Sequence, residues 1–402
     1  MARVRVLSLF DGISCGKLSI EDAGIEVAEY YASEVNEFSM GISKYNFPDI
    51  IQIGDVTKID TSTLPTIDLL IGGSPCQNFS FSGTGKGAVT VEGIEVTTLE
   101  QYMELKEQGF QFEGQSYLFW EYVRILRDIK PKYFLLENVN MAEKWKNVIT
   151  KTLGVEPILI NSKLVSAQSR PRLYWTNIPN ITQPEDKGLY IKDVLEDEYT
   201  EKEVLSKMVL DRYQPLKCSY AVGTTKPEFR KIGQRDYVYG DNNKMACLVA
   251  TDYKQPKQVL HNGVIRKISP VEAERFQTLP DNYTKYGMFG EVVKEISHTK
   301  RFEGIGNGWT KAVITHIMTF LKKALEDCSE EVEEETTEDK LQAADQPLKS
   351  MEIEEGENEE MEEKIKELEA MLAEKEKESK AKDNEIMKLK AQLFDLMMKE
   401  SA

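Results

Sequence analysis

The sequence has few of the residues that build metal sites and disulfide frameworks. Its 402 residues include five cysteines and three histidines, and no two cysteines form a CxxC pair. An odd number of scattered cysteines argues against a disulfide framework, and the lack of clustered ligands argues against structural zinc. We therefore expect no metal cofactor.

Long apolar runs and internal repeats are also missing. The chain contains no stretch of about 18 apolar residues, the length a membrane helix needs. Its first residues, "MARVRVLSLFDG", continue directly into a strand pattern rather than a signal peptide. No repeat of solenoid or propeller length is present. We expect a soluble protein of the cytoplasm.

Negative charge is concentrated at the carboxyl-terminal end. The formal net charge is −17, and residues 326–402 hold 27 acidic side chains against 11 lysines, which accounts for −16 of it. Residues 1–325 are therefore almost neutral and can still present a basic surface to phosphates. The overall acidity does not exclude a nucleic-acid partner.

Apolar strand patterns alternate with helical patterns through the first half of the chain. The strand patterns are at residues 4–10, 27–34, 50–55, 67–73, 132–139 and 157–165. Helical patterns lie between them, and the clearest spans residues 118–129. This order predicts an α/β fold with a Rossmann-like, doubly wound sheet of mostly parallel strands, which binds ligands at the carboxyl ends of its strands.

The loop after the first strand is suited to a nucleotide-like ligand. Gly12 and Gly16 allow close approach of the backbone, and Glu34 ends the second strand, where a carboxylate can bind ribose hydroxyls. The loop lacks a full GxGxxG pattern, so an adenosine-containing cofactor smaller than a dinucleotide fits as well. Ordinary turn glycines are the alternative interpretation.

A cysteine follows the fourth strand pattern. In "IGGSPCQNFSFSG", residues 71–83, Cys76 comes directly after Pro75 and just past the apolar run 67–73. A cysteine beside an apolar strand is usually a small core residue. The carboxyl end of a parallel strand is also where chemistry takes place in such folds. This segment alone leaves both interpretations open.

Eight stretches in order resemble the DNA (cytosine-5)-methyltransferase family. They are "LFDGISCG", "SE" at 33–34, "GD" at 54–55, "GGSPCQNFS", "LLENV", "QSRPR" at 168–172, "SPVEAERFQTLP" at 269–280 and "GIGNGW" at 304–309. The stretches "LSLFDGI" and "GGSPC", together with Trp309, are most similar to the de novo branch of that family. The resemblance spans residues 4 to about 322 and implies a methyltransferase domain that depends on S-adenosylmethionine.

The resemblance also implies the catalytic residues. Cys76 would add to carbon 6 of cytosine, Glu137 would contact N3 and the exocyclic amine, and Arg172 would face O2 with Arg170 in support. Taken singly, Glu137 could be a solvated carboxylate and the arginines a phosphate-binding pair. The four positions together favour catalysis.

The implied cofactor is S-adenosylmethionine, released as S-adenosylhomocysteine. By position in the family motifs, its contacts are Phe10, Asp11, Gly12 and Ile13 in the first loop, Glu34 on the ribose, Asp55 near the adenine amine, and Asn307 and Trp309 near the methionine end.

The implied partner is double-stranded DNA, from which the target base must be flipped out under a closing loop. Residues 77–117 would supply that loop, although residues 88–111 look like an insertion that the family lacks. We expect the insertion to be a helical decoration of the surface, or else to alter DNA contacts.

Residues 189–264 interleave basic and aromatic side chains and predict the target-recognition domain, the alternative being a β domain with an ordinary charged face.

The tail has two parts. Residues 326–360 are too acidic and polar to build a core and predict a disordered linker. Residues 361–398 predict a coiled coil, because apolar residues occupy one heptad frame at Met361, Ile365, Leu368, Leu372, Ile386, Leu389, Leu393 and Leu396. Polar residues interrupt the frame at Lys375, Ser379 and Lys382. The coiled coil would dimerise the chain or bind a partner protein, and a lone solvated helix is the alternative.

These observations predict a catalytic domain formed by residues 1–188 and 265–325, and a DNA cytosine-5 methyltransferase. Two alternatives remain from the sequence: an RNA cytosine-5 methyltransferase, and a non-catalytic DNA-binding scaffold that acts through its tail. A place in a restriction-modification system and a stand-alone role both stay open, as does the recognition sequence.

Overall fold

The computed structural model describes residues 3–75, 78–79, 86–227 and 231–343, with side chains as far as Asp327. The chain divides into two compact units, Met1–Glu334 and Glu335–Ala402. Cys76 and the predicted coiled coil lie outside the described residues. The description that follows concerns the first unit.

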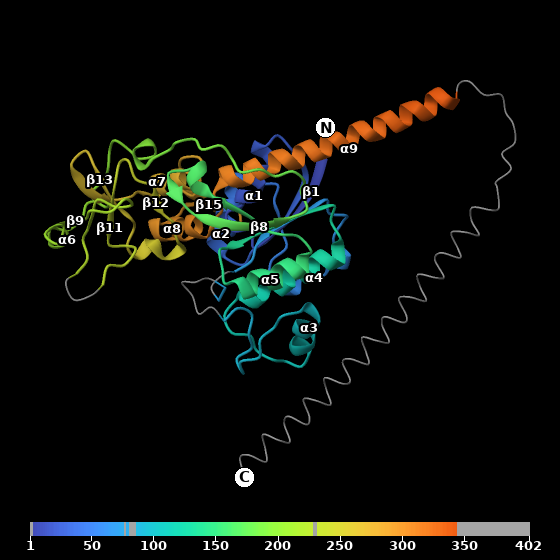
Figure 1. Ribbon diagram of the computed structural model, residues 1–402, viewed down its shortest axis with the longest axis horizontal. Helices are drawn as coiled ribbons and strands as arrows, with labels where there is room; N and C mark the ends of the chain where they lie inside the picture. The colour runs from blue at the N-terminus through green and yellow to red at the C-terminus, as the bar shows by residue number, and fades with distance from the viewer. Residues whose placement is uncertain (1–2, 76–77, 80–85, 228–230, 344–402) are drawn as a thin grey trace, which may run out of the picture. The chain divides into compact units, whose positions relative to one another are not determined.

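A seven-stranded sheet forms the centre of this unit, in the order β3-β2-β1-β4-β5-β8-β6 (Figure 1). Its strands are β1 (Arg3–Leu9), β2 (Glu26–Ser33), β3 (Ile51–Gln52), β4 (Leu69–Gly73), β5 (Tyr133–Val139), β6 (Ile158–Asn161) and β8 (Pro171–Thr176). The pairs from β3 to β5 are parallel, whereas β8 runs antiparallel to both β5 and β6. The predicted α/β fold with a mostly parallel sheet is confirmed.

Helices cover both faces of the sheet because its strands alternate apolar side chains between them. Leu7, Leu70 and Leu136 join a cluster with side chains of α4 (Phe119–Ile129) and α5 (Glu143–Leu153). Val6 and Leu69 point to the other face, with side chains of α1 (Cys15–Asp22) and α9 (Lys311–Ala343). Figure 1 shows α4 and α5 on one side of the sheet and α1 on the other.

The helix α9, at the end of the family-like region, packs against the first strand of the sheet. Val313, Ile317 and Leu321 are fully buried in the same cluster as Val4 and Val6. The helix then continues to Ala343, so the structure differs from the predicted disordered linker over residues 326–343. No glycine or proline interrupts this stretch, and its seven Glu residues favour a helix despite their polarity.

A second sheet lies in the region predicted to recognise the target. It has five strands in the order β14-β13-β11-β10-β9: β9 (Gln214–Pro215), β10 (Gly223–Thr224), β11 (Tyr237–Gly240), β13 (Gln258–His261) and β14 (Val264–Lys267). A short strand of the same region, β12 (Met245–Ala246), pairs in parallel with β7 (Gln168–Ser169) of the motif "QSRPR". This pairing ties the second sheet region to the end of the central sheet.

The segment that looks like an insertion is folded onto the central unit. Its helix α3 (Leu99–Glu107) buries Leu99, Tyr102 and Leu105 in the cluster that also contains α4. Tyr102 Oη donates to Glu121 Oε1 of α4 at 2.6 Å. The expectation of a helical surface element is met. Residues 88–90 and one face of α3 are packed on the central unit, whereas residues 91–95 are exposed.

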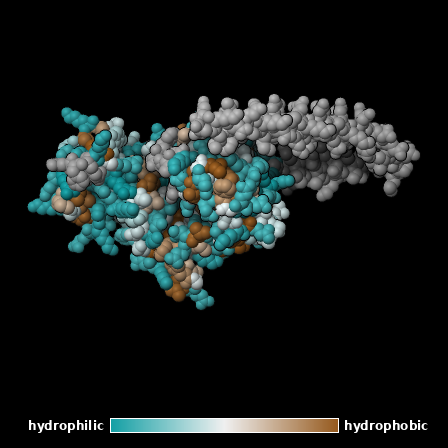
Figure 2. All heavy atoms as spheres, turned by 90° about the horizontal axis from the view of Figure 1, so that it is seen from below, coloured by the Kyte–Doolittle hydropathy of each residue, from teal (hydrophilic) through white to brown (hydrophobic). Residues whose placement is uncertain are grey.

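Among the described residues, no helix has the length and apolarity needed to cross a membrane. On the face shown in Figure 2, hydrophobic residues form separate patches divided by hydrophilic ones. Within the same described ranges, no group of three or more His, Cys, Asp or Glu is arranged to hold a metal ion.

Candidate active site

Three strand ends bring the family-like motifs together. Glu137 of β5 pairs with Gly73, the last residue of β4. Arg172 lies near the start of β8, and because β8 is antiparallel it pairs with Val139 at the end of β5. The register therefore places Glu137 and Arg172 beside the strand that leads to Cys76.

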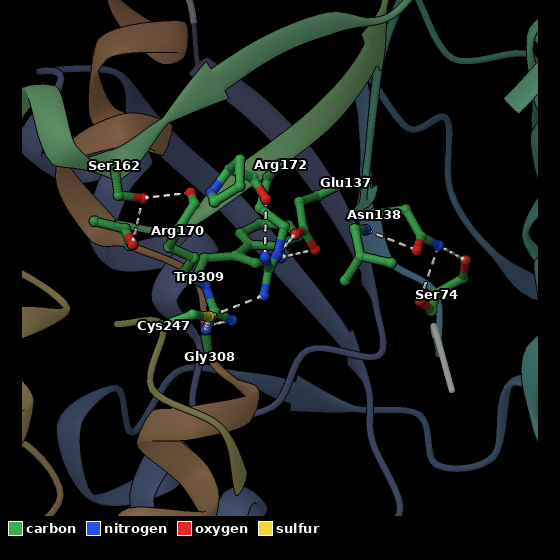
Figure 3. Close-up of polar contacts among 12 residues, drawn as sticks. Ser74, Glu137, Asn138, Ser162, Arg170, Arg172, Cys247, Gly308 and Trp309 are labelled. Atoms are coloured by element: carbon green, nitrogen blue, oxygen red, sulfur yellow. Dashed lines mark hydrogen bonds and ion pairs between the residues drawn. The ribbon is translucent and has the colours of Figure 1, made fainter. Parts of the chain in front are cut away.

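The carboxylate of Glu137 is held by two donors from distant segments. Arg172 Nε lies 2.9 Å from its Oε1, and Trp309 Nε1 donates to its Oε2 at 3.0 Å (Figure 3). Glu137 is only 8% exposed, so one ion pair and one hydrogen bond to a buried carboxylate fix its orientation strongly. The structure thus brings together three of the sequence-predicted site residues.

Gly73 leaves room for this arrangement. A Cβ at this position would lie 2.8 Å from Trp309 Nε1 and 3.0 Å from Glu137 Oε2. Any side chain would displace one of the two groups, since real Cβ atoms do not tolerate such contacts. The second glycine of "IGG" is therefore explained by the carboxylate beside it.

The segment before Cys76 is fastened to β5. Asn138 Nδ2 donates to Ser74 Oγ at 3.1 Å and to the Ser74 carbonyl at 3.2 Å, and both residues are buried. Ser74 is two residues before Cys76, so this anchor fixes where the chain leaves the sheet. Cys76 itself lies outside the described residues, and its predicted role stays a prediction.

The guanidinium of Arg172 is engaged at all three nitrogens. Besides the contact from Nε to Glu137, Nη1 donates to the Pro171 carbonyl at 2.9 Å and Nη2 to Cys247 Sγ at 3.6 Å. Burial lowers the pKa of Arg172, but the negative charges of Cys247 and Glu137 outweigh burial and raise that pKa overall. Arg172 therefore stays a cation in this position.

Arg170 joins three segments of backbone. Its Nη1 donates to the Leu248 carbonyl at 2.7 Å, and its Nη2 donates to the carbonyls of Gly308 at 2.9 Å and Gly306 at 3.3 Å. The residue is 4% exposed, so these carbonyls occupy its donors. This geometry fits the supporting role predicted for Arg170 and not a contact with a base.

The cofactor candidates of the first three strands lie at neighbouring carboxyl ends. Glu34 Oε2 accepts from the Gly12 amide at 2.8 Å, which joins the loop after β1 to the end of β2. Gly12 and Gly54 have positive φ, and a Cβ at either would meet no atom within 4 Å. Phe10 has a φ of 58° and is partly exposed. Open space thus faces the backbone at the position where a ligand must approach closely.

Asp11 and Ile13 point into the protein. Asp11 accepts hydrogen bonds from Tyr30 Oη, at 2.7 Å, and from Ser14 Oγ, and burial raises its pKa to about 6. The Ile13 side chain is fully buried, and its carbonyl accepts from Tyr283 Oη. These two residues shape the loop, and Ile13 can offer a ligand only its backbone.

The remaining cofactor candidates are at the ends of β3 and α8 (His298–Asn307). Asp55 Oδ1 accepts from the Thr57 amide at 3.0 Å and caps a short helical turn, while its side chain stays partly exposed. Asn307 is exposed at the last position of α8. Trp309 lies against the start of α1, since a Cβ on Gly16 would be 3.4 Å from its ring.

Sequence reasoning missed Cys247 and Gln168. Gln168 is fully buried and its Oε1 accepts from the Leu248 amide at 2.8 Å, which adds a side-chain link to the pairing of β7 with β12. Cys247 has no motif around it, so only the fold reveals its contact with the two arginines.

The family model for C-5 cytosine-specific DNA methylase matches residues 4–323. The chain is 25% identical over 324 residues to the Type II methyltransferase M.HhaI of Haemophilus parahaemolyticus, which covers 74% of this chain and 90% of that protein. It is 28% identical over 357 residues to the Type II methyltransferase M1.ScrFI of Lactococcus lactis subsp. cremoris, with 81% and 79% covered. The solved structure of the methyltransferase EhMeth of Entamoeba histolytica has a similar fold, with a TM-score of 0.57 and 16% identity over 81% of this chain and 99% of that chain.

Proposed function

Since the chain belongs to the C-5 cytosine-specific DNA methylase family and is therefore a DNA cytosine methyltransferase, we propose that it methylates carbon 5 of a flipped-out cytosine in double-stranded DNA through a covalent adduct of Cys76. S-adenosylmethionine is the proposed methyl donor. The observation that carries this proposal is the buried contact of Glu137 with Arg172 and Trp309 beside the end of β4.

The chemistry requires a nucleophilic residue because carbon 5 of cytosine is itself a poor nucleophile and does not attack the methyl group of the donor unaided. When the Cys76 thiolate bonds to carbon 6, the ring electrons move toward N3 and O2 and carbon 5 becomes nucleophilic. After methyl transfer, loss of the proton from carbon 5 expels the thiolate and restores the ring. The bond to Cys76 is thus formed and broken in each turnover.

Glu137 and Arg172 are the groups that meet the displaced electrons. Arg172 stays charged at O2, where negative charge develops, and Glu137 hydrogen-bonds at N3 and the exocyclic amine. Their mutual contact at 2.9 Å supports these roles, because it holds both groups in place before the base arrives. Groups fixed in advance lose little free energy to reorganisation during the reaction.

The residues at the ends of β1, β2 and β3 fit the proposed cofactor. The Glu34 carboxylate suits ribose hydroxyls, Asp55 is a partly exposed acceptor for an exocyclic amine, and Gly12 and Gly54 leave open space at the backbone. Phe10 would offer an aromatic face, and Trp309 and Asn307 would hold the methionine end. S-adenosylmethionine, when bound, supplies the methyl group.

The second sheet region is proposed to recognise the target. Basic side chains such as Lys226, Lys231 and Lys254 belong to it, together with exposed aromatics such as Tyr220. Residues of this kind hold phosphates and stack on bases. The parallel pairing of β12 with β7 supports this proposal, because β7 belongs to the same motif as Arg172.

Bisulfite sequencing of plasmid DNA from cells that express the chain tests the proposal. We expect unconverted cytosines at a recurring short sequence with the wild-type chain, and none with Cys76→Ala at equal expression. Purified protein should methylate a duplex containing that sequence and not the matching RNA. Full conversion of the plasmid by bisulfite in both cases would contradict the proposal, and methylation of the RNA alone would favour the alternative substrate.

A further inference from the structure

Cys247 lies between the two arginines of the "QSRPR" motif. Its Sγ is 3.2 Å from Arg170 Nη1 and 3.6 Å from Arg172 Nη2 (Figure 3). In its thiol form the same sulfur donates to the Leu248 carbonyl at 3.4 Å. Cys247 follows β12, so it reaches the reaction site from the second sheet region.

The two arginines depend on this sulfur to different degrees. Arg170 has backbone carbonyls at both terminal nitrogens, whereas Arg172 Nη2 has Cys247 as its hydrogen-bond partner. Arg172 Nη1 donates to the carbonyl of the preceding residue, Pro171, which lies on the same strand. Within the described part of the chain, Glu137 and Cys247 are therefore the side chains outside its own strand that contact the Arg172 guanidinium.

The charges around the sulfur favour its ionised form. Two guanidiniums face Cys247, and the Glu137 carboxylate contacts one of them. A thiolate at position 247 would balance the second positive charge. Burial raises the pKa of the Cys247 thiol, but the charges of Arg170 and Arg172 outweigh burial and lower that pKa overall. Charge-assisted hydrogen bonds are roughly twice as strong as neutral ones.

We propose that Cys247 is a positioning residue that orients the Arg172 guanidinium for the methyl-transfer reaction. The proposal rests on the proposed function, in which Arg172 faces O2 of the cytosine. Cys247 does not touch the base, and it acts by fixing Nη2 of Arg172, which neither Glu137 nor Pro171 contacts. It also links the second sheet region to catalysis, because its backbone belongs to that region.

Two substitutions separate positioning from packing. Cys247→Ser keeps an acceptor at the sulfur position, whereas Cys247→Val fills a similar volume without one. We expect the single-turnover methylation rate to fall about tenfold or more in the valine variant and about threefold in the serine variant, since an unmade hydrogen bond to a charged group is costly. Binding of S-adenosylhomocysteine should be unchanged in both, which also shows that both are folded. Cys218→Ser serves as the control, and its rate should match the wild type.

An active valine variant beside an impaired serine variant would show that Cys247 only packs, and would overturn the proposal. Wild-type rates in both variants would overturn it as well. Loss of activity in the valine variant with recovery in the serine variant supports it.

Thiol labelling tests the contact without relying on methylation. The full chain is treated with iodoacetamide between about pH 6 and 9, and the labelling rate of each cysteine is read by peptide mass spectrometry. We expect the midpoint for Cys247 to move upward in Arg172→Gln, because a cation that stabilises the thiolate is lost. An unchanged midpoint would overturn the contact. If the midpoint moves but wild-type protein methylates no DNA, the contact stands and the proposed function fails.

Discussion

At the scale of single residues, the site depends on groups that arrive from separate segments and hold each other. Glu137 forms an ion pair with Arg172 and accepts a hydrogen bond from Trp309, which lie 35 and 172 positions further along the chain. The motifs predicted that Glu137 and Arg172 share a site. They could not predict the contact with Trp309, because that contact requires the turn after α8 to return beside β5.

We expect Glu137→Gln to lower the single-turnover rate of methylation roughly 100-fold or more, while DNA affinity changes little. The amide keeps the shape of the side chain but removes the charge and the exchangeable proton that act on the activated ring. Quenched-flow measurement of methyl transfer and a binding titration with the same duplex give the two values. Glu143→Gln, an exposed carboxylate on α5, is the matched control. Equal losses of rate and affinity would assign Glu137 to DNA binding.

Gly73→Ala should lower the methylation rate about tenfold and also the melting temperature. The added Cβ would sit 2.8 Å from Trp309 Nε1, and overpacking of this kind costs about 1–3 kcal/mol. Gly154→Ala at the end of α5 is a control for stability alone, because its φ of +72° is strained for alanine while no atom lies within 4 Å. A wild-type rate in Gly73→Ala would mean that Glu137 tolerates displacement.

At the scale of elements, the helix α3 is attached to α4 through a buried carboxylate. Glu121 is fully buried and is contacted by Tyr102 and Lys106 of α3 and by Arg124 of its own helix. The sequence predicted a helix in this segment from its composition. Its attachment could not be predicted, because Glu121 appears in the sequence as one more charge on an amphipathic helix.

Glu121→Gln should destabilise the protein by about 2 kcal/mol at neutral pH, since the partners of a buried charge lose their counterion. Burial raises the pKa of Glu121, but hydrogen bonds from Lys106, Tyr102 and Arg124 lower it overall from its ordinary 4.5. A lowered folded-state pKa stabilises the protein above the ordinary value, and this contribution is lost as pH falls below it. The difference in unfolding free energy between wild type and variant should therefore shrink below about pH 4.5.

Denaturant titrations of both proteins between pH 3.5 and 7 provide the measurement. Glu107→Gln, an exposed residue of α3, is the control and should show no such trend. A difference that is constant across this range would mean that the charge of Glu121 does not contribute.

At the scale of the whole molecule, the first unit contains every residue proposed for catalysis or cofactor binding. The buried residues of α9 extend to Ala324, and the unit ends at Glu334. The motif order predicted that the catalytic fold closes near residue 322. It did not predict that α9 continues to Ala343, because a highly acidic composition is typical of disorder, while Glu also has a high helix propensity.

A chain that ends at Glu334 should keep the methylation rate of the full chain within about twofold, because an acidic tail contributes no phosphate contacts. A chain that ends at Gly308 should not fold, since it lacks the α9 side chains that cover β1. Methylation assays and sedimentation of the two longer forms test this. If the heptads pair, the full chain should self-associate more strongly than the chain that ends at Glu334. An inactive but folded chain of residues 1–334 would show that the tail takes part in catalysis.

The formation of a covalent bond between Cys76 and cytosine tests the central proposal most directly. A duplex that carries 5-fluorocytosine at the methylated position has no proton to lose at carbon 5, so the thiolate cannot be expelled after methyl transfer. We expect wild-type protein with S-adenosylmethionine to form a stable adduct, and peptide mass spectrometry to locate the methylated nucleotide on Cys76. Cys76→Ala should form none. An adduct on Cys247, or complete methylation of an unmodified duplex by Cys76→Ala, would contradict the mechanism.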